Sequence, residues 1–412
     1  MQVYLVGGAL RDRLLGRPVR ERDWVVVGAD PGELIARGFT PVGRDFPVFL
    51  HPQTREEYAL ARLERKVAPG YRGFVTQFSA DVTLEQDLRR RDLTINAMAE
   101  SPTGEIIDPF GGRRDLEARV LRHVSDAFIE DPVRIVRVAR FAARFAPLGF
   151  RVAPETLALM SHMVRTGEAD ALVPERLWQE TERALAEERP EVFFEVLREC
   201  GALARLYPQI EALFGVPQPA EWHPEIDTGA HVLLALRCAA RMRTSTVVRY
   251  AALVHDLGKA LTPRELWPGH RGHEAAGAAL VEVLSRRIKA PNEYLQLGVL
   301  AAGHHTSVHR ALSLRPSTLL ELLEATDAFR RSGRFGELLL ACEADARGRA
   351  GLEERPYPQA DYLRRAREAA AAAVLTPQDR QLLKGPAVGA RLREHRLAAL
   401  ASFKSSYGAG AG

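Results

Sequence analysis

The sequence predicts an α+β N-terminal part followed by a chain that is helical to its C-terminus. Over residues 1–115, short β-branched and aromatic runs alternate with amphipathic segments, whereas from Leu116 onward apolar residues recur at helical spacing. The chain has 412 residues, which is too long for a single hydrophobic core and indicates several domains.

The first part begins with a run of strand-forming residues, Val3–Val6, that ends in Gly7-Gly8 and leads into an amphipathic helix. This pattern predicts a helix over 9–15 and further strands over 24–27, 47–50 and 58–61. The basic, glycine-containing stretch Arg65–Phe74 is typical of a mobile loop.

Proline stands at or near the start of several later helical segments, as expected for a first helical turn. We predict helices over 131–145, 154–166, 174–187 and 190–200. A histidine-rich helical segment then covers about 225–330, a last helical region begins at Arg331, and the end from Ser405 is predicted to be disordered.

The composition is that of an ordinary globular protein, with 46% hydrophobic and 27% charged residues. The net charge of +4 is compatible with a polyanionic partner. The three cysteines lie far apart and form no C-x-x-C pair, which favours reduced, buried thiols. No apolar run reaches the ~18 residues of a membrane helix, so we expect no membrane partner and a cytoplasmic location.

The Gly7-Gly8 pair between a strand and a helix is the first candidate site. Glycine lets the backbone approach a phosphate closely, and Arg11 in the following turn can reach the same phosphate. The alternative for such a pair on its own is a plain tight turn.

Glu21 and Asp23 are the second candidate, because their spacing of two places both carboxylates on one face of a strand. Two such carboxylates can hold a pair of divalent ions for phosphoryl transfer, and hard oxygen ligands favour Mg²⁺. The alternative is a pair of solvated charges before a strand.

Two arginine-rich segments follow. In Arg89-Arg90-Arg91-Asp92-Leu-Thr-Ile-Asn96, an arginine and an amide could hold a triphosphate or recognise a ribose. In the later segment, steps of three place Asp131, Arg134, Arg137 and Arg140 along one stripe of a helix. A neighbouring carboxylate and guanidinium could match the polar edges of cytosine or adenine, although a salt-bridged amphipathic helix explains any single pair.

Together these motifs resemble the class II tRNA nucleotidyltransferases of the polymerase β superfamily. The matching segments are Leu5–Asp12, Glu21–Asp23, Arg90–Ala97, Glu130–Phe141 and Pro174–Arg176. The similarity is closest to bacterial CCA-adding enzymes with a C-terminal HD phosphohydrolase domain. It implies a polymerase-β-like nucleotidyltransferase head over 1–115, a neck with a base-templating helix over 116–150, a helical tRNA-binding body over 151–224, an HD domain over 225–330 and a helical tail over 331–412.

The resemblance also implies the role of each residue. Gly8 and Arg11 would contact the incoming ATP or CTP, Glu21 and Asp23 would bind Mg²⁺, and Arg91 would hold phosphates or ribose. Asp131 and Arg134 would template the base, while Arg137 and Arg140 would orient that pair and contact the nucleotide. The loop Arg65–Phe74 would move when specificity changes from CTP to ATP. This family usually has Asp-x-Asp, so Glu21 is a departure that alters the metal geometry.

Eight of the twelve histidines lie between residues 223 and 309. Adjacent His255-Asp256 stand in an apolar helical stretch, where buried charge calls for a bound partner. The order His231, His255-Asp256, His270 or His273, and His304 or His305 resembles the HD phosphohydrolases, with His231, His255, Asp256 and His305 as implied metal ligands. The alternative is a set of scattered polar histidines.

Mixed imidazole and carboxylate ligands favour a transition metal, for which we expect Ni²⁺. The resemblance implies hydrolysis of 2′,3′-cyclic phosphates, 2′-phosphates or other phosphomonoesters, in repair of tRNA ends. Thr306 stands where some relatives have an acid, Asp327 is the candidate for the later acid, and Lys259 could orient the phosphate or pair with Asp256.

The resemblance therefore predicts addition of the 3′-terminal CCA to tRNA from CTP and ATP, with the acceptor arm bound by phosphate contacts. Two other functions remain open, namely a poly(A) polymerase or A-only adding enzyme, and a metal phosphohydrolase whose head merely binds RNA. We expect a monomer, with a homodimer as the alternative.

Overall fold

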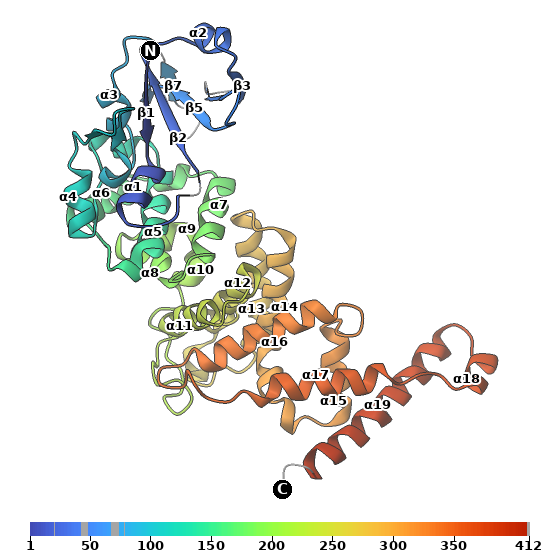
Figure 1. Cartoon of the computed structure of the whole chain (residues 1–412). Helices are drawn as coiled ribbons and strands as arrows, with labels where there is room; N and C mark the ends of the chain where they lie inside the picture. Colours follow the sequence, from blue (N-terminus) through green and yellow to red (C-terminus); the bar gives the residue numbers. More distant parts are fainter. Residues whose placement is uncertain (20, 43–47, 67–73, 78, 410–412) are drawn as a thin grey trace. The chain divides into compact units, whose positions relative to one another are not determined.

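The computed structural model describes all residues except 20, 43–47, 67–73, 78 and 410–412. The chain divides into two compact units, Met1–Leu206 and Tyr207–Gly412 (Figure 1). The expected α+β first part and helical remainder are confirmed. The finer division at residues 115, 150, 224 and 330 stays a prediction.

A mixed seven-stranded sheet organises the first unit, in the order β3-β4-β5-β2-β1-β8-β9. Its strands are β1 (Gln2–Val6), β2 (Asp23–Val27), β3 (Thr40–Val42), β4 (Val48–Leu50), β5 (Glu57–Leu60), β8 (Ala99–Glu100) and β9 (Ile106–Ile107). β1 and β2 are antiparallel, with Val6 opposite Asp23, and β2 runs parallel to β5. The sequence predicts fewer strands because β8 and β9 have two residues each, too few to show an alternating pattern.

The two faces of this sheet carry separate apolar clusters. Val25 packs in one cluster with Val6 and Leu88, whereas the next residue, Val26, packs in the other with Leu34 and Phe49. Successive side chains of a strand point to opposite faces, so β2 is buried on both sides. Asp23 is therefore the first residue of a strand that packs against apolar side chains on both faces of the sheet.

Helices account for most of the rest of the first unit. They are α1 (Gly8–Leu14), α2 (Pro31–Ala36), α3 (Leu84–Arg89), α4 (Gly112–Ala118), α5 (Val133–Phe145), α6 (Pro154–Arg165), α7 (Pro174–Leu185), α8 (Glu191–Glu199) and α9 (Ala202–Leu206). Helix α5 packs against α7 and α8. Its face carrying Ile135, Val138 and Ala142 is buried, and this fixes where the arginines of the same helix point.

Two small sheets complete the first unit. Strands β6 (Leu63–Lys66) and β7 (Phe74–Gln77) are antiparallel, and β10 (Val120–Leu121) and β11 (Arg151–Val152) are parallel. The prediction of a mobile loop over Arg65–Phe74 is wrong at its ends, because Arg65 and Lys66 belong to β6 and Phe74 to β7, and its residues 67–73 lie outside the described part of the chain.

The second unit is helical throughout its described length. Its helices are α10 (Pro208–Glu211), α11 (Thr228–Arg241), α12 (Thr246–Val254), α13 (His273–Arg287), α14 (Asn292–His309), α15 (Pro316–Ala325), α16 (Ser332–Arg347), α17 (Pro358–Ala371), α18 (Pro377–Leu382) and α19 (Pro386–Ala409). Helices α11, α12, α13, α14 and α16 pack on one another, and a short 3₁₀ helix, Leu257–Leu261, lies against α13.

The end of the chain is more ordered than the sequence predicts. Helix α19 continues past Ser405 to Ala409 because Phe403 and Tyr407 pack on Tyr362 of α17, with ring centroids 5.3 and 4.8 Å away. The expectation of a disordered tail from Ser405 is therefore wrong for residues 405–409. All three cysteines are buried and free, as the sequence predicts. Among the described residues, no helix has both the length and the apolar character required to cross a membrane.

Candidate functional site

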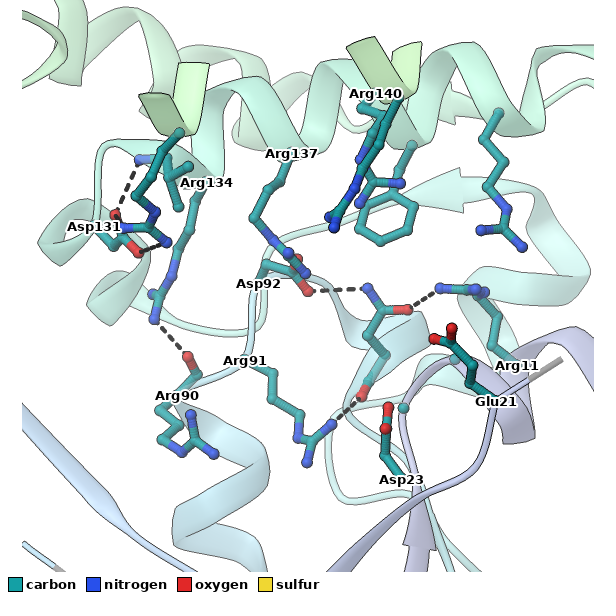
Figure 2. Close-up of a pocket in the computed structure, with 18 of the residues that line it drawn as sticks. Arg11, Glu21, Asp23, Arg90, Arg91, Asp92, Asp131, Arg134, Arg137 and Arg140 are labelled. Carbon is teal, nitrogen blue, oxygen red and sulfur yellow. Dashed lines mark hydrogen bonds and ion pairs between the residues drawn. The ribbon is translucent and has the colours of Figure 1, made fainter. Parts of the chain in front are cut away.

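A cavity of about 800 Å³ lies in the first unit where β1, β2 and α5 come together (Figure 2). Four carboxylates line it, those of Glu21, Asp23, Asp92 and Asp131. Ten arginines also line it: Arg11, Arg62, Arg90, Arg91, Arg134, Arg137, Arg140, Arg144, Arg176 and Arg183. Such an excess of guanidinium groups suits a polyanionic ligand such as a nucleoside triphosphate.

Gly7 and Gly8 form the turn between β1 and α1 at one wall of this cavity. Gly7 has φ of +70°, and a Cβ there would lie 3.1 Å from Nη1 of Arg91. A side chain at residue 7 would thus strain the backbone and displace Arg91. The turn leaves Gly8 and Arg11 beside open space that a phosphate could enter.

The carboxylates of Glu21 and Asp23 project into the same cavity, Asp23 from the first position of β2 (Figure 2). Burial raises the pKa of Asp23, Arg91 lowers it and the nearby Glu21 carboxylate raises it, so that it lies above its ordinary value. Two carboxylates that repel each other in this way are stabilised by a cation between them. The pair therefore fits a divalent metal site.

A chain of hydrogen bonds connects the predicted nucleotide ligands across the floor of the cavity. Arg137 donates from Nε to Oδ2 of Asp92 at 2.8 Å, and Asn96 donates to Oδ1 of Asp92 at 2.9 Å. Arg11 in turn donates to Oδ1 of Asn96 at 2.6 Å. Asp92 and Asn96 are buried, so this chain sets the positions of Arg11 and Arg137 before any ligand binds.

Arg91 lies on the side of the cavity that faces the carboxylate pair. It contacts Oδ2 of buried Asp87 at 3.2 Å and donates to the carbonyl oxygen of Asn96 at 3.4 Å. It lies beside the Gly7 turn and Asp23, and its role in holding phosphates or ribose stays a prediction.

Asp131 and Arg134, predicted to template the base, lie at the start of α5. The two carboxylate oxygens of Asp131 each lie 3.4 Å from a guanidinium nitrogen of Arg176. Arg134 is buried and donates to the carbonyl oxygens of Ala127, at 2.6 Å, and Arg90, at 2.5 Å. Figure 2 shows Arg134, Arg137 and Arg140 extending from α5 toward the cavity.

The other arginines of α5 are paired with carboxylates from other segments. Arg140 forms a buried ion pair with Glu180 of α7, and Arg144 lies 2.9 Å from Asp12 of α1. Glu180 lies in no motif that the sequence singles out, and Asp12 ends the Leu5–Asp12 motif but has no predicted role there. The α5 stripe is thus both the cavity wall and a connection between neighbouring helices.

Six buried residues of the types that bind metals lie together in the second unit. We call them the histidine cluster: His231, His255, Asp256, His273, His305 and Asp345. Within it, the ligand atoms of His231, His255 and Asp256 lie within 4.8 Å of one another, as do those of His255, His305 and Asp345, and those of Asp256, His273 and His305. All six residues are buried. Scattered polar histidines, the alternative at the sequence level, are therefore excluded.

Asp256 lies between two sides of the histidine cluster. Its Oδ2 is 3.2 Å from Nε2 of His255, while its Oδ1 is 3.5 Å from Nε2 of His273 and 3.4 Å from Nε2 of His305. The buried Nε2 of His255 and Oδ1 of Asp256 accept or donate no hydrogen bond within the described structure. Buried polar atoms of this kind fit a metal-binding role.

Asp345 of α16 is the later acid of the histidine cluster, and the expectation for Asp327 is wrong. Oδ1 of Asp345 lies 3.0 Å from Nε2 of His231, and its Oδ2 lies 3.5 Å from Nε2 of His255. Asp327 instead follows α15 and pairs with Arg330 at 2.7 Å. Asp345 lies far along the chain from the other ligands, in a segment with an ordinary helical pattern. No local sequence motif therefore identifies it as a ligand.

Three further residues hold the ligands in place. Glu225 lies 2.9 Å from Nδ1 of His231, which turns the other ring nitrogen toward Asp345. Lys259 donates to Oδ2 of Asp256 at 2.6 Å, as the pairing alternative predicts. His309, on the last turn of α14, lies 2.5 Å from Oδ2 of Asp345.

Electrostatics separates the histidines of the cluster. Burial lowers the pKa of His305 to about 4, which keeps its ring neutral. Burial also opposes protonation of His255, but the carboxylates of Asp256 and Asp345 raise its pKa to about 9. An excess of negative charge at His255 is the condition in which a cation would replace the proton.

Comparison with known families gives three matches along the chain. Residues 3–122 match the Poly A polymerase head domain, residues 149–214 match the family described as Probable RNA and SrmB- binding site of polymerase A, and residues 228–345 match the HD domain. The cavity lined by Glu21 and Asp23 involves the first match, and the histidine cluster falls within the third.

Two curated relatives are similar over nearly the whole chain, and both are named Multifunctional CCA protein. The one from Methylococcus capsulatus is 63% identical over 98% of this chain and 96% of its own length. The one from Thioalkalivibrio sulfidiphilus is 62% identical over 99% of this chain and 100% of its own length.

Solved structures share the fold at lower identity. A CCA-adding enzyme in an apo form has a TM-score of 0.66 at 21% identity, covering 97% of this chain and 88% of that chain. A CCA-adding enzyme with ATP has a TM-score of 0.64 at 20% identity, covering 97% and 86%. The Thermotoga maritima CCA-adding enzyme complexed with tRNA has a TM-score of 0.62 at 20% identity, covering 98% and 91%.

Proposed function

The chain belongs to the multifunctional CCA proteins, and from this premise we propose that it adds and repairs the 3′-terminal CCA of tRNA. It is a nucleotidyltransferase that uses CTP and ATP without a nucleic-acid template and releases pyrophosphate. The observation that carries this function is the meeting of Glu21 and Asp23 with ten arginines in one cavity of about 800 Å³.

In this reaction the 3′-hydroxyl oxygen of the RNA forms a bond to the α-phosphorus of the nucleotide. The bond from that phosphorus to the bridging oxygen breaks, and pyrophosphate leaves with its electron pair. Ions bound by Glu21 and Asp23, which we propose to be Mg²⁺, would activate the hydroxyl and neutralise the leaving group. Arg11, Arg91 and the Gly8 backbone bind the triphosphate, and the Asp92–Asn96 hydrogen bond keeps Arg11 and Arg137 in position.

Base selection is proposed for Asp131 and Arg134. The two carbonyl contacts of Arg134 fix its guanidinium at the cavity wall. Arg176 positions the Asp131 carboxylate. A fixed carboxylate beside a fixed guanidinium can present the acceptor and donor pattern that a template base would otherwise supply. Arg137 and Arg140 would orient this pair and contact the nucleotide.

The direct test is a sequencing-gel assay with a tRNA that lacks its CCA end, Mg²⁺, and CTP, ATP or both. We expect growth by C, C and then A, and no further. A ladder of A residues would show a poly(A) polymerase, and A added only to an existing CC end would show an A-only adding enzyme. Either of these results would contradict the CCA-adding function.

The HD domain would add a phosphohydrolase activity for repair of tRNA ends, acting on 2′,3′-cyclic phosphates, 2′-phosphates and phosphomonoesters. Support comes from the six buried ligand residues of the histidine cluster. Mixed imidazole and carboxylate ligands suit a transition metal, which we propose to be Ni²⁺. Metal bound there would activate a water molecule for attack on the phosphorus.

We further propose that the histidine cluster holds two ions per chain with Asp256 shared between them. His231 and His255 approach Oδ2 of Asp256, with Asp345 beside these two histidines, whereas His273 and His305 approach Oδ1. A carboxylate with a separate set of imidazoles at each oxygen is suited to bridging two metals.

The tRNA acceptor arm would be held through its phosphates, so that binding weakens with salt. As a tRNA-processing protein, the chain is proposed to act in the cytoplasm and as a monomer. Size-exclusion chromatography with light scattering distinguishes this from a homodimer.

A further inference from the structure

A second cavity, of about 730 Å³, lies in the helical unit and adjoins the histidine cluster. We call it the Trp222 pocket, after the exposed side chain on its rim, and its lining includes Trp222, His309, Arg310, Arg349, Arg355 and Tyr357. His309 has a place in both sites, because its Nε2 lies 2.5 Å from Oδ2 of Asp345 while its ring lines the pocket. The imidazole of His309 is therefore in contact both with the Trp222 pocket and with the proposed hydrolytic centre.

Arg349 is a second connection between the two sites. Its Nη2 lies 3.5 Å from Oδ1 of Asp345, and its Nη1 donates to the carbonyl oxygen of Trp222 at 3.3 Å. His309 is also fixed from the pocket side, since its Nδ1 lies 2.8 Å from the hydroxyl oxygen of Tyr357. The Trp222 pocket thus has a defined orientation relative to Asp345.

The lining of the Trp222 pocket carries positive charge, since four arginines line it and no carboxylate does. Two of these arginines, Arg347 and Arg349, pair with carboxylates outside the lining. Arg310 and Arg355 are exposed, and neither forms an ion pair with another part of the chain that the structure describes. Exposed guanidinium groups that have no internal partner are suited to phosphodiester oxygens.

The rim also offers a flat aromatic surface. The Trp222 side chain is 49% exposed, which is unusual for an indole of this size. It lies in the segment before α11 and is held there through its backbone by Arg349. Exposed aromatic rings beside arginines are the common means of binding unpaired bases of RNA.

We propose that the Trp222 pocket binds the terminal nucleotide of an RNA 3′ end, whose phosphate ester is presented to the histidine cluster. Trp222 stacks on the base, while Arg310 and Arg355 bind the phosphodiester that precedes the terminal nucleotide. This inference rests on the proposed phosphohydrolase function and deepens it by assigning the Trp222 pocket as the place where the RNA end is held, so that an RNA end is preferred to a free mononucleotide or a simple phosphate ester.

Binding is measured first, without turnover. The probe is adenosine 2′,3′-cyclic phosphate added to the full-length protein in EDTA, and the signal is tryptophan fluorescence. Stacking on Trp222 should give a saturable quench, and Trp222→Leu should remove it. The described lining of the head cavity contains no tryptophan, so a nucleotide bound there should not mimic this signal. A quench of unchanged amplitude and midpoint in Trp222→Leu would overturn the stacking role.

Hydrolysis by the metal-loaded protein then separates the two parts of the pocket. Two substrates are compared, adenosine 2′,3′-cyclic phosphate and an RNA trinucleotide that ends in the same cyclic phosphate. Trp222→Leu should raise KM for both by about tenfold with little change in kcat. Arg355→Gln should raise KM several-fold for the trinucleotide alone. Equal effects of Arg355→Gln on both substrates would contradict the phosphodiester contact and indicate a site for mononucleotides.

Arg330→Gln is the matched control, because Arg330 is an exposed arginine of the same unit that pairs with Asp327 outside the Trp222 pocket. It should leave both KM values unchanged, and thermal melting verifies that all variants are folded. If Trp222→Leu abolishes the quench in a protein that hydrolyses no phosphate ester, the pocket stands and the phosphohydrolase function fails. If hydrolysis is normal and both variants behave as Arg330→Gln does, the function stands and the pocket proposal fails.

Discussion

Arg137 contacts Asp92 with two nitrogens, since Nε and Nη2 lie 2.8 and 2.7 Å from the same oxygen, Oδ2. Burial raises the pKa of Asp92, but Arg137 and the hydrogen bond from Asn96 lower it by more than burial raises it. The pKa therefore lies well below the usual carboxyl range. This ionised pair therefore contributes to stability at neutral pH, and the contribution is lost progressively as the pH falls from the ordinary Asp pKa toward the lowered one.

Replacing Arg137 by Ala should leave the Asp92 carboxylate buried without its main partner. We expect the free energy of unfolding to fall by about 1–3 kcal/mol, and nucleotide addition to fall strongly because Asn96 and Arg11 lose their positions. Urea unfolding and the gel assay measure the two effects. Arg37→Ala, which removes only an exposed pair with Glu33, should change stability by less than about 0.5 kcal/mol.

Asp23→Ala should abolish CTP and ATP addition and leave phosphate-ester hydrolysis intact, because the two activities have separate metal ligands. Glu21→Ala should have the same selectivity, whereas Glu21→Asp should retain part of the addition activity since it keeps a carboxylate. Both activities are measured on the same preparation of each variant. Full CCA addition by Asp23→Ala would remove the metal assignment.

Much of the head follows from local sequence patterns. The strand runs at 3–6 and 24–27 and the helix over 131–145 were identified because each has its own periodicity and stop signals. The partners of the α5 arginines did not follow, because Glu180 and Asp12 meet them only through tertiary packing. Period-two spacing also failed to reveal that Glu21 precedes β2, which begins at Asp23.

Asp345→Asn should abolish hydrolysis and greatly weaken metal binding, because it removes the charge that faces both His231 and His255. Asp327→Asn is the matched control in the same unit and should leave both properties unchanged. Metal content after dialysis, measured by plasma mass spectrometry, checks this independently of activity. A protein with Asp345→Asn that keeps its full metal content would contradict the ligand assignment.

The two-ion proposal gives a stoichiometry. We expect the intact protein to bind two transition-metal ions per histidine cluster and His305→Ala to bind fewer, since His305 approaches Oδ1 of Asp256 and also lies in one ligand group with His255 and Asp345. Asp256→Asn should weaken both sites. Isothermal titration with Ni²⁺ counts the ions, and a single ion in the intact protein would exclude the bridging arrangement.

Gly258→Ala should disrupt the histidine cluster through the backbone. A Cβ at this residue would lie 1.9 Å from the carbonyl oxygen of His273 and 2.6 Å from the nitrogen of Gly277. We expect a loss of about 1–3 kcal/mol in the free energy of unfolding together with a loss of hydrolysis, because Asp256 and His273 move apart. Gly336→Ala, where nothing lies within 4 Å, should be neutral or stabilising by up to about 1 kcal/mol.

Only some residues of the histidine cluster can be predicted from the sequence. His255 and Asp256 form a local motif, so their burial could be predicted from the apolar residues around them. Asp345 and Glu225 could not be identified, because each meets His231 only through tertiary packing from a different helix or loop. The prediction of Asp327 as a ligand rests only on its position along the chain. Its exposed contact with Arg330 shows that position along the chain is not enough to identify a ligand.

The burial of Val25 and Val26 in opposite apolar clusters has a consequence for how the chain tolerates insertions. Adding one residue between Asp23 and Val25 would either rotate both valines out of their clusters or turn the Asp23 carboxylate to the far face of the sheet. The packing of the two valines therefore also determines on which face of the sheet the Asp23 carboxylate lies. Length variation between β1 and β2 should be confined to residues 15–19, which follow α1 and belong to no strand.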